Sequence, residues 1–144
     1  MESVHPLVVH FPIALLLTAI ALELLAGLTH RPWLRRVGRW NLCLGTVGAA
    51  IAVLTGLQAE ESAKHSFEIW QVMQLHERLG ISTLILGLMG SGVHLATRNR
   101  VTRGSLLIVW LIMACLVVTI SWGAFLGGRL VYEFGVGGLF GTER

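Results

Sequence analysis

Four long apolar runs dominate this chain, at about residues 6–29, 40–57, 70–97 and 105–127. A helix crosses the hydrocarbon core of a bilayer with about 17–25 apolar residues, so each run is long enough to span a membrane. Only 13% of the residues are charged, whereas soluble domains carry about 25%. The sequence therefore predicts an all-α membrane protein, a four-transmembrane-helix bundle that forms a single domain over residues 1–144.

The arginines indicate how the bundle is oriented. They gather between runs one and two and between runs three and four: Arg31, Arg35, Arg36, Arg39, Arg98, Arg100 and Arg103. Most of the acidic residues belong to the other side. Basic loops stay on the cytoplasmic side of a membrane. Both termini are therefore predicted to lie on the outer (periplasmic) side.

Two histidines near the outer ends of runs one and three are candidate ligands, because ionisable residues inside a membrane are candidates for function. His10 lies two residues before Pro12, which leaves the carbonyl of Val8 without its helical donor and is expected to open the helix there. His76 is expected at a similar depth. Two such imidazoles can hold a haem iron from both sides. The alternative is that His10 only bonds a neighbour near the interface.

Small residues follow both histidines at helical spacing. The two faces are His10, Ala14, Thr18 and Ala21 in run one, and His76, Gly80, Thr83, Gly87, Gly90 and His94 in run three. Facing one another, they would leave a flat cavity for a porphyrin, lined by Gly80 and Gly87. Close helix packing alone is an equally good interpretation, since small residues at this spacing let helices approach in lipid.

Glu23 is the acidic residue inside an apolar run, and an acid there is costly unless it is paired or protonated. Its candidate partners are Arg35, Arg36 and His94. Glu23 and His94 are a candidate proton or quinone site, and a local ion pair is the alternative.

His30 lies twenty residues after His10, roughly on the opposite face of the helix. We therefore expect one haem and not two.

The opening HPLVVHFPIALLL and the ending WGAFLGGRLVYEFGVGG resemble the hallmarks of a bacterial family of predicted membrane proteins, a domain of unknown function with family number 2231. That family has four spans, an HPxxVHFP opening, a histidine before span three and a GGxLVYxHGVG ending. The resemblance covers nearly the whole chain. It implies a multi-pass protein of the bacterial inner (plasma) membrane that is similar to a small b-type cytochrome.

The resemblance also implies a ligand set. Phe134 stands where the ending usually has a histidine, which leaves His10 and His76 as the predicted ligands of a non-covalent haem b, with His5 as the alternative to His10. Glycines after run four are expected to turn the chain at the interface. Arg129 and Tyr132 could then bond the haem propionates, or they could simply anchor the chain at the interface.

A haem with two protein ligands has no open coordination position, so it would relay electrons and not activate oxygen. The expected function is electron transfer between an outer redox partner and quinone or a neighbouring membrane subunit, within the lipid bilayer. The sequence has no Cys-x-x-Cys-His motif, iron–sulfur spacing or nucleotide loop, so a non-catalytic subunit is expected, and nucleic acid is not an expected partner. The alternatives are a cofactor-free structural or accessory subunit and a channel built around Glu23.

Overall fold

The computed structural model of the chain describes residues 5–61, 66–97 and 102–136, with the backbone alone at residues 59–61. Its elements are α1 (His5–Val8), α2 (His10–Thr29), α3 (Pro32–Glu61), α4 (Phe67–Ala96) and α5 (Arg103–Tyr132). Within these residues, four stretches are long and apolar enough to cross a membrane: His5–Thr29, Pro32–Gln58, Phe67–Ala96 and Arg103–Tyr132. The predicted all-helical, four-span architecture is confirmed.

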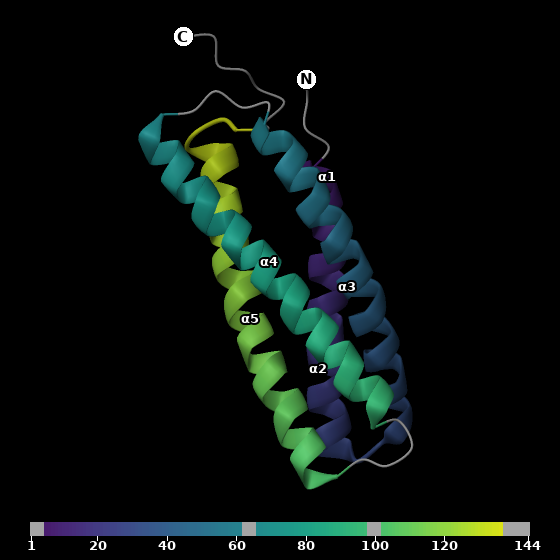
Figure 1. Cartoon of the computed structure of the whole chain (residues 1–144). Helices are drawn as coiled ribbons and strands as arrows, with labels where there is room; N and C mark the ends of the chain where they lie inside the picture. The colour runs from purple at the N-terminus through teal and green to yellow at the C-terminus, as the bar shows by residue number, and fades with distance from the viewer. Residues whose placement is uncertain (1–4, 62–65, 98–101, 137–144) are drawn as a thin grey trace.

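The four spans run up and down beside one another (Figure 1). Helix α2 packs along α3, α4 packs along α5, and α3 joins the two pairs by packing against α4, whereas the backbones of α2 and α5 come close at only a few points. We call the end that holds the start of α1 and the end of α5 the terminal end. The opposite end, with the turn between α2 and α3, is the loop end. Which end faces the cytoplasm stays a prediction.

The second span begins earlier than its apolar run suggests. Helix α3 starts at Pro32 and not near residue 40, so Arg35, Arg36 and Arg39 lie in its first turns and not in a loop. Proline suits the first position of a helix, and His30 ends α2 in the left-handed region at φ 55°. Long arginine side chains can reach water from within a helix, so the arginines before residue 40 do not show where the second span begins. Arg98 and Arg100 lie outside the described residues.

The fourth span ends later than predicted. Helix α5 begins with a capping box between Thr102 and Ser105 and continues to Tyr132. Gly127 therefore lies within the helix, and the expected turn comes only at Gly135, with φ +66°. The hydrogen bond from the Glu133 N–H to the Arg129 carbonyl, 2.9 Å, continues the helical ladder beyond Gly127 and Gly128.

The first span is interrupted at Val9, between α1 and α2. Pro12 has no N–H to donate to the carbonyl of Val8, which is the reason predicted from the sequence. The bonds on either side persist, from the Val9 N–H to the His5 carbonyl at 3.1 Å and from the Ile13 N–H to the Val9 carbonyl at 3.3 Å. The backbone of Val9 stays helical, at φ −65° and ψ −26°, so the break does not end the span.

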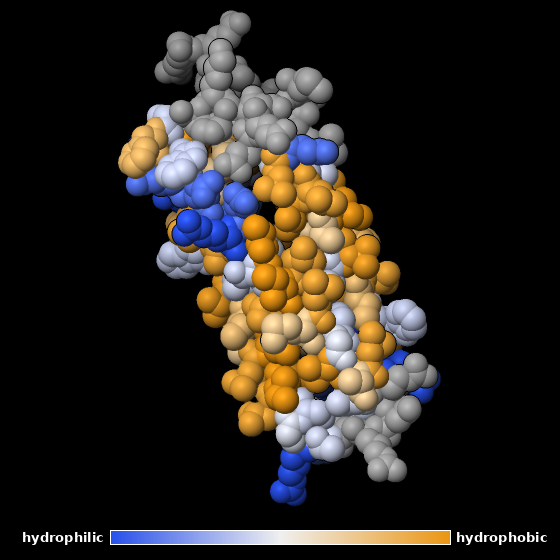
Figure 2. Space-filling view, viewed as in Figure 1, coloured by the Kyte–Doolittle hydropathy of each residue, from blue (hydrophilic) through white to orange (hydrophobic). Residues whose placement is uncertain are grey.

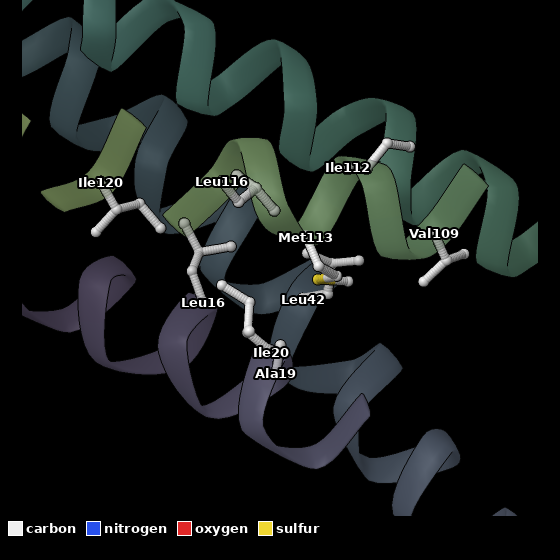
Figure 3. Close-up of a cluster of buried hydrophobic side chains, with 9 residues drawn as sticks. All are labelled: Leu16, Ala19, Ile20, Leu42, Val109, Ile112, Met113, Leu116 and Ile120. Carbon is white, nitrogen blue, oxygen red and sulfur yellow. The ribbon is translucent and has the colours of Figure 1, made fainter. Parts of the chain in front are cut away.

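An apolar core lies between α2, α3 and α5 near the middle of the bundle (Figure 3). Its members are Leu16, Ala19, Ile20, Leu42, Val109, Ile112, Met113, Leu116 and Ile120. The outside is apolar as well, and in Figure 2 hydrophobic side chains cover the middle of the molecule while hydrophilic ones gather toward its ends. That distribution suits a protein surrounded by lipid tails.

Candidate functional site

Two histidine rings meet at the terminal end of the bundle. His5, in the first turn of α1, and His76, in α4, place their ring centroids 6.2 Å apart with an angle of 85° between the ring planes. Both side chains are partly buried. The sequence places these histidines 71 positions apart, and only the folding of the bundle brings their rings together.

The hydrogen bonds of the two rings indicate their tautomers. His76 Nδ1 lies 2.9 Å from the Gly123 carbonyl oxygen, which can only accept, so Nδ1 carries the proton. His5 Nδ1 lies 3.1 Å from Thr55 Oγ1. The Thr55 hydroxyl donates to the Ala52 carbonyl at 3.0 Å, so it accepts from His5 Nδ1. In both neutral rings Nε2 then keeps its lone pair.

Each ring lies against a glycine. A Cβ built on Gly56 of α3 would lie 3.0 Å from His5 Cε1, and one built on Gly127 of α5 would lie 3.0 Å from His76 Cε1. Contacts this short leave no comfortable room for a methyl group. Gly56 of α3 and Gly127 of α5 therefore make room for the two imidazoles.

His10 takes no part in this pair. Its side chain is exposed, and its Nδ1 lies 2.6 Å from the Pro6 carbonyl oxygen. His5 occupies the place beside His76 that His10 was predicted to take. Five residues correspond to about 140° around a helix axis, so the two histidines cannot face the same neighbour. The sequence named His5 as the alternative ligand without a way to decide between them.

The small residues that follow the two histidines do not form the expected flat cavity. On α2, Ala14, Thr18 and Ala21 are exposed, like His10. On α4, Thr83, Gly87, Gly90 and His94 are buried, as predicted for an inward face. A Cβ on Gly87, however, would lie 2.6 Å from Thr46 Oγ1, and one on Gly90 would lie 3.2 Å from Leu42 Cδ2. Side chains of α3 thus fill the space, and close packing is the better interpretation there.

Gly80 is less crowded, because the nearest atom to its notional Cβ is Val53 Cγ2 at 3.8 Å.

Arg129 and Tyr132, which were predicted to bond the haem propionates, do not turn toward the histidines. The Arg129 side chain donates from Nε to Glu133 Oε2 at 2.8 Å, and its guanidinium lies 5.7 Å from the Phe134 ring centroid. Tyr132 is 91% exposed. This arrangement corresponds to the interfacial anchor named as the alternative.

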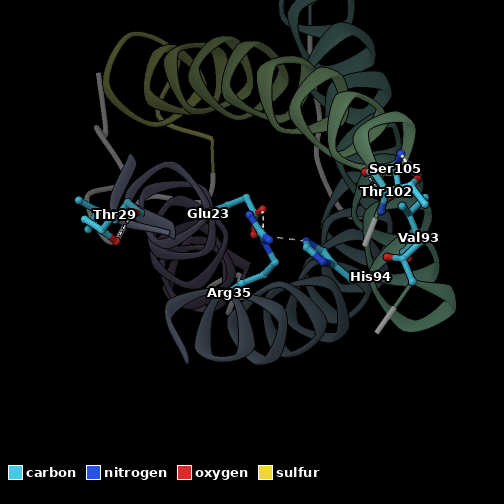
Figure 4. A network of polar contacts seen from close by, with 9 residues as sticks. Glu23, Thr29, Arg35, Val93, His94, Thr102 and Ser105 are labelled. Atoms are coloured by element: carbon cyan, nitrogen blue, oxygen red, sulfur yellow. Dashed lines mark hydrogen bonds and ion pairs between the residues drawn. The ribbon is translucent and has the colours of Figure 1, made fainter. Parts of the chain in front are cut away.

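A second polar cluster lies near the loop end, where Glu23, Arg35 and His94 point toward one another (Figure 4). Glu23 is 2% exposed, and Arg35 Nε donates to its Oε1 at 2.9 Å. His94 Nε2 lies 3.8 Å from the other carboxylate oxygen, Oε2. The structure thus brings together Glu23 and two of its three predicted partners, while Arg36 is exposed. The turn between α2 and α3 places Arg35 next to the acid.

The cluster is incompletely satisfied. Glu23 Oε2, Arg39 Nε and Ser91 Oγ are buried and have no hydrogen-bond partner among the residues that the structure describes. The cluster is also remote from the histidine pair. His76 and His94 are eighteen residues apart on α4, which corresponds to about 27 Å along the helix axis. The two polar sites are therefore separate.

The histidine pair offers two imidazoles and no further donor of the same kind. Within the described ranges, no group of three or more His, Cys, Asp or Glu residues could hold a metal ion, and Cys43 and Cys115 are free thiols. A structural zinc ion takes about four protein ligands. The two imidazoles are therefore fewer ligands than a structural zinc ion takes.

Comparison with known proteins agrees with the architecture. The model of the family described as "Predicted membrane protein (DUF2231)" matches residues 1–139. No curated protein and no solved structure matches the chain. The match extends over the opening with His5 and His10, over His76, and over the end of α5. The four-span chain therefore belongs to the DUF2231 family of predicted membrane proteins.

Proposed function

We propose that the protein is an electron-transfer subunit of the bacterial inner membrane, similar to a small b-type cytochrome. In this proposal His5 and His76 would hold one non-covalent haem b. The observation that carries the proposal is the pair of anchored imidazoles with centroids 6.2 Å apart. His5 thus replaces His10 as the partner of His76, because His10 is exposed on another face of the span.

The separation of the rings suits a single metal atom between them. A metal about 2 Å from each imidazole nitrogen, together with the size of the rings, holds the two centroids roughly 6 Å apart. The near-perpendicular ring planes are compatible with this, since each imidazole can rotate about its own bond to a metal.

The hydrogen bonds around the rings also support ligation. Histidines that bind a metal usually donate their other ring N–H to a carbonyl or carboxylate, which sets the tautomer and raises the basicity of the ligand. His76 donates Nδ1–H to the Gly123 carbonyl, and His5 donates to Thr55. Both Nε2 atoms therefore keep a lone pair that can bind a metal. Thr55 of α3 and Gly123 of α5 orient the two rings through these hydrogen bonds.

Haem held by His5 and His76 would supply one-electron transfer. The chain's own part is to bind the group, orient it and keep it at the terminal end of the bundle. From there an outer redox subunit could deliver electrons, and quinone or a neighbouring membrane subunit could accept them. His94, which lies beside Glu23, is about 27 Å from His76 along α4, so a quinone bound there would not contact this haem.

The visible spectrum of the purified protein, before and after reduction with dithionite, tests the proposal. We expect a sharp α band and a pyridine haemochrome that corresponds to one haem per chain. His5→Ala and His76→Ala should each lose the cofactor, and the matched controls His10→Ala and His30→Ala should keep it. Loss in His10→Ala with retention in His5→Ala would overturn the ligand assignment.

The second candidate is a cofactor-free accessory subunit of a larger membrane complex. It is favoured by the exposed small residues Ala14, Thr18 and Ala21 on α2, since such a face lets another helix approach closely. A colourless protein, purified with haem supplied during expression, would support this candidate against the first. Replacing Ala14 and Ala21 by Leu should then reduce the mass of the complex on a native gel.

A further inference from the structure

A groove opens at the loop end between α2, α3 and α5. Its volume is about 450 Å³, and its lining includes Gly27, Leu28, Arg31, Arg35, Leu106 and Trp110. The Trp110 ring lies directly on the backbone of α2, because a Cβ on Gly27 would be only 2.8 Å from its Cζ2 atom. The groove is separate from the His5–His76 pair and from the packed face of α4 that contains Gly87 and Gly90.

The lining of the groove combines apolar and basic residues. Gly27, Leu106 and Trp110 are among the apolar ones, and Arg31 and Arg35 come from the turn between α2 and α3 and the first turn of α3, next to His30 and Pro32. Arg31 is exposed. Arg35 uses Nε for Glu23, and a guanidinium has further N–H donors on its two Nη atoms. A ligand here would meet both hydrogen-bond donors and an apolar surface.

The charge around the groove has one sign. The arginines at the loop end, within the described part of the chain, are Arg31, Arg35, Arg36, Arg39 and Arg103. The acidic side chain described at that end is Glu23, which is buried and bonded to Arg35. An anionic group is therefore favoured at the rim, while a cationic group is disfavoured there.

We propose that this groove binds an acidic phospholipid, with its phosphate against Arg31 and the Nη groups of Arg35 and the first part of an acyl chain along Leu106 and Trp110. Arginine pairs with phosphate through parallel N–H donors. Basic pockets between membrane helices are suited to anionic headgroups. A headgroup with a quaternary ammonium would instead bring a cation toward the arginines. The proposal is independent of haem binding.

Native mass spectrometry of the delipidated full-length protein tests the proposal with three probes: phosphatidylglycerol, phosphatidylcholine and inorganic phosphate. Two arginines near the membrane surface are expected to favour phosphatidylglycerol over phosphatidylcholine by about tenfold or more. Inorganic phosphate should not displace the lipid, since it lacks the acyl chain. Equal retention of both lipids, or displacement by phosphate, would overturn the proposal.

Two variants locate the site. Arg31→Gln should reduce the preference for phosphatidylglycerol severalfold, because Arg35 remains. The matched control Arg36→Gln removes the same charge outside the groove and should keep the full preference. Phosphatidylglycerol with brominated acyl chains should quench tryptophan fluorescence in the wild type. The part of the quenching that comes from Trp110 should be absent in Trp110→Phe. An equal loss in both arginine variants, or unchanged quenching in Trp110→Phe, would contradict the assignment.

Discussion

At the scale of single residues, the terminal site depends on how closely two imidazoles approach the backbone of neighbouring helices. His76 has the clearer anchor, because its Nδ1 bonds a backbone carbonyl, Gly123, that no side-chain substitution removes. Four residues further along the same face of α5, Gly127 leaves room for the ring. The position of His76 is therefore determined by α5 as much as by α4.

Gly127→Val should displace the His76 ring. Its new Cβ would lie 3.0 Å from Cε1, and overpacking of this kind costs about 1–3 kcal/mol. We expect a weaker or shifted α band and a lower free energy of unfolding. Gly128→Ala is the matched control, because no described atom lies within 4 Å of its Cβ. An unchanged spectrum in Gly127→Val would argue against His76 as a ligand.

Glu23 is a residue on which stability should depend strongly. Glu23→Leu leaves Arg35 without its carboxylate, and losing one partner of a buried ion pair costs about 3–5 kcal/mol. Because Arg35 is 21% exposed, the loss of unfolding free energy in Glu23→Leu should fall near the lower limit of this range. Glu23→Gln should lose less, because its amide oxygen can still accept a hydrogen bond from Arg35. Unfolding in a denaturing detergent measures both. Haem content should not change in Glu23→Gln, and its loss would show that the two polar sites are coupled.

At the scale of elements, α4 carries one polar site near each end and a closely packed face between them. The glycines in that face carry no side chain, and side chains of α3 occupy the space beside them. Thr46, whose hydroxyl donates to the Leu42 carbonyl at 2.7 Å, fills the space beside Gly87. At this position the contact with Thr46 therefore limits how closely α3 and α4 approach one another.

Gly87→Ala should push α3 and α4 apart, since its Cβ would lie 2.6 Å from Thr46 Oγ1 and 3.2 Å from Thr46 Cγ2. We expect a loss of about 1–3 kcal/mol in the free energy of unfolding. The double variant with Thr46→Ala should recover part of that loss, as contacting residues do in a double-mutant cycle. Gly92→Ala, at an exposed position with no described atom within 4 Å, is the control. Additive losses would rule out the contact.

At the scale of the whole molecule, the two ends differ in charge and in chemistry. The terminal end holds the histidine pair, and the loop end holds the arginines, the buried Glu23 and the groove. If basic segments face the cytoplasm, electrons would enter from the periplasmic side and acidic lipid would bind in the inner leaflet. Both proposals therefore share a single prediction about orientation.

Cysteine labelling measures this orientation. In a background without Cys43 and Cys115, we expect Ser66→Cys to react with a membrane-impermeant maleimide in intact cells. Arg103→Cys should react only after the inner membrane is permeabilised. Ser66 and Arg103 are both exposed and lie at opposite ends of the bundle. The reverse pattern would place both termini and the histidine pair on the cytoplasmic side.

Much of the architecture follows from the sequence alone. The four spans are long apolar runs, the break near Val9 follows from Pro12, and the ion pair of Glu23 follows from a buried acid with arginines nearby. The helix ends were harder to predict, because α3 extends back to Pro32 and α5 continues past Gly127. Arginine and glycine are both compatible with a helix that reaches the interface.

The tertiary structure decided which faces turn inward. It placed His5 and not His10 beside His76, put Ala14 and Thr18 outside, and filled the space beside Gly87 with Thr46. The physical reason is the solvent. Lipid tails are as apolar as the bundle interior, so alternation of polar and apolar residues cannot show which face of a helix is buried. The sequence by itself determines how many helices cross the membrane, and packing between them determines which histidines meet.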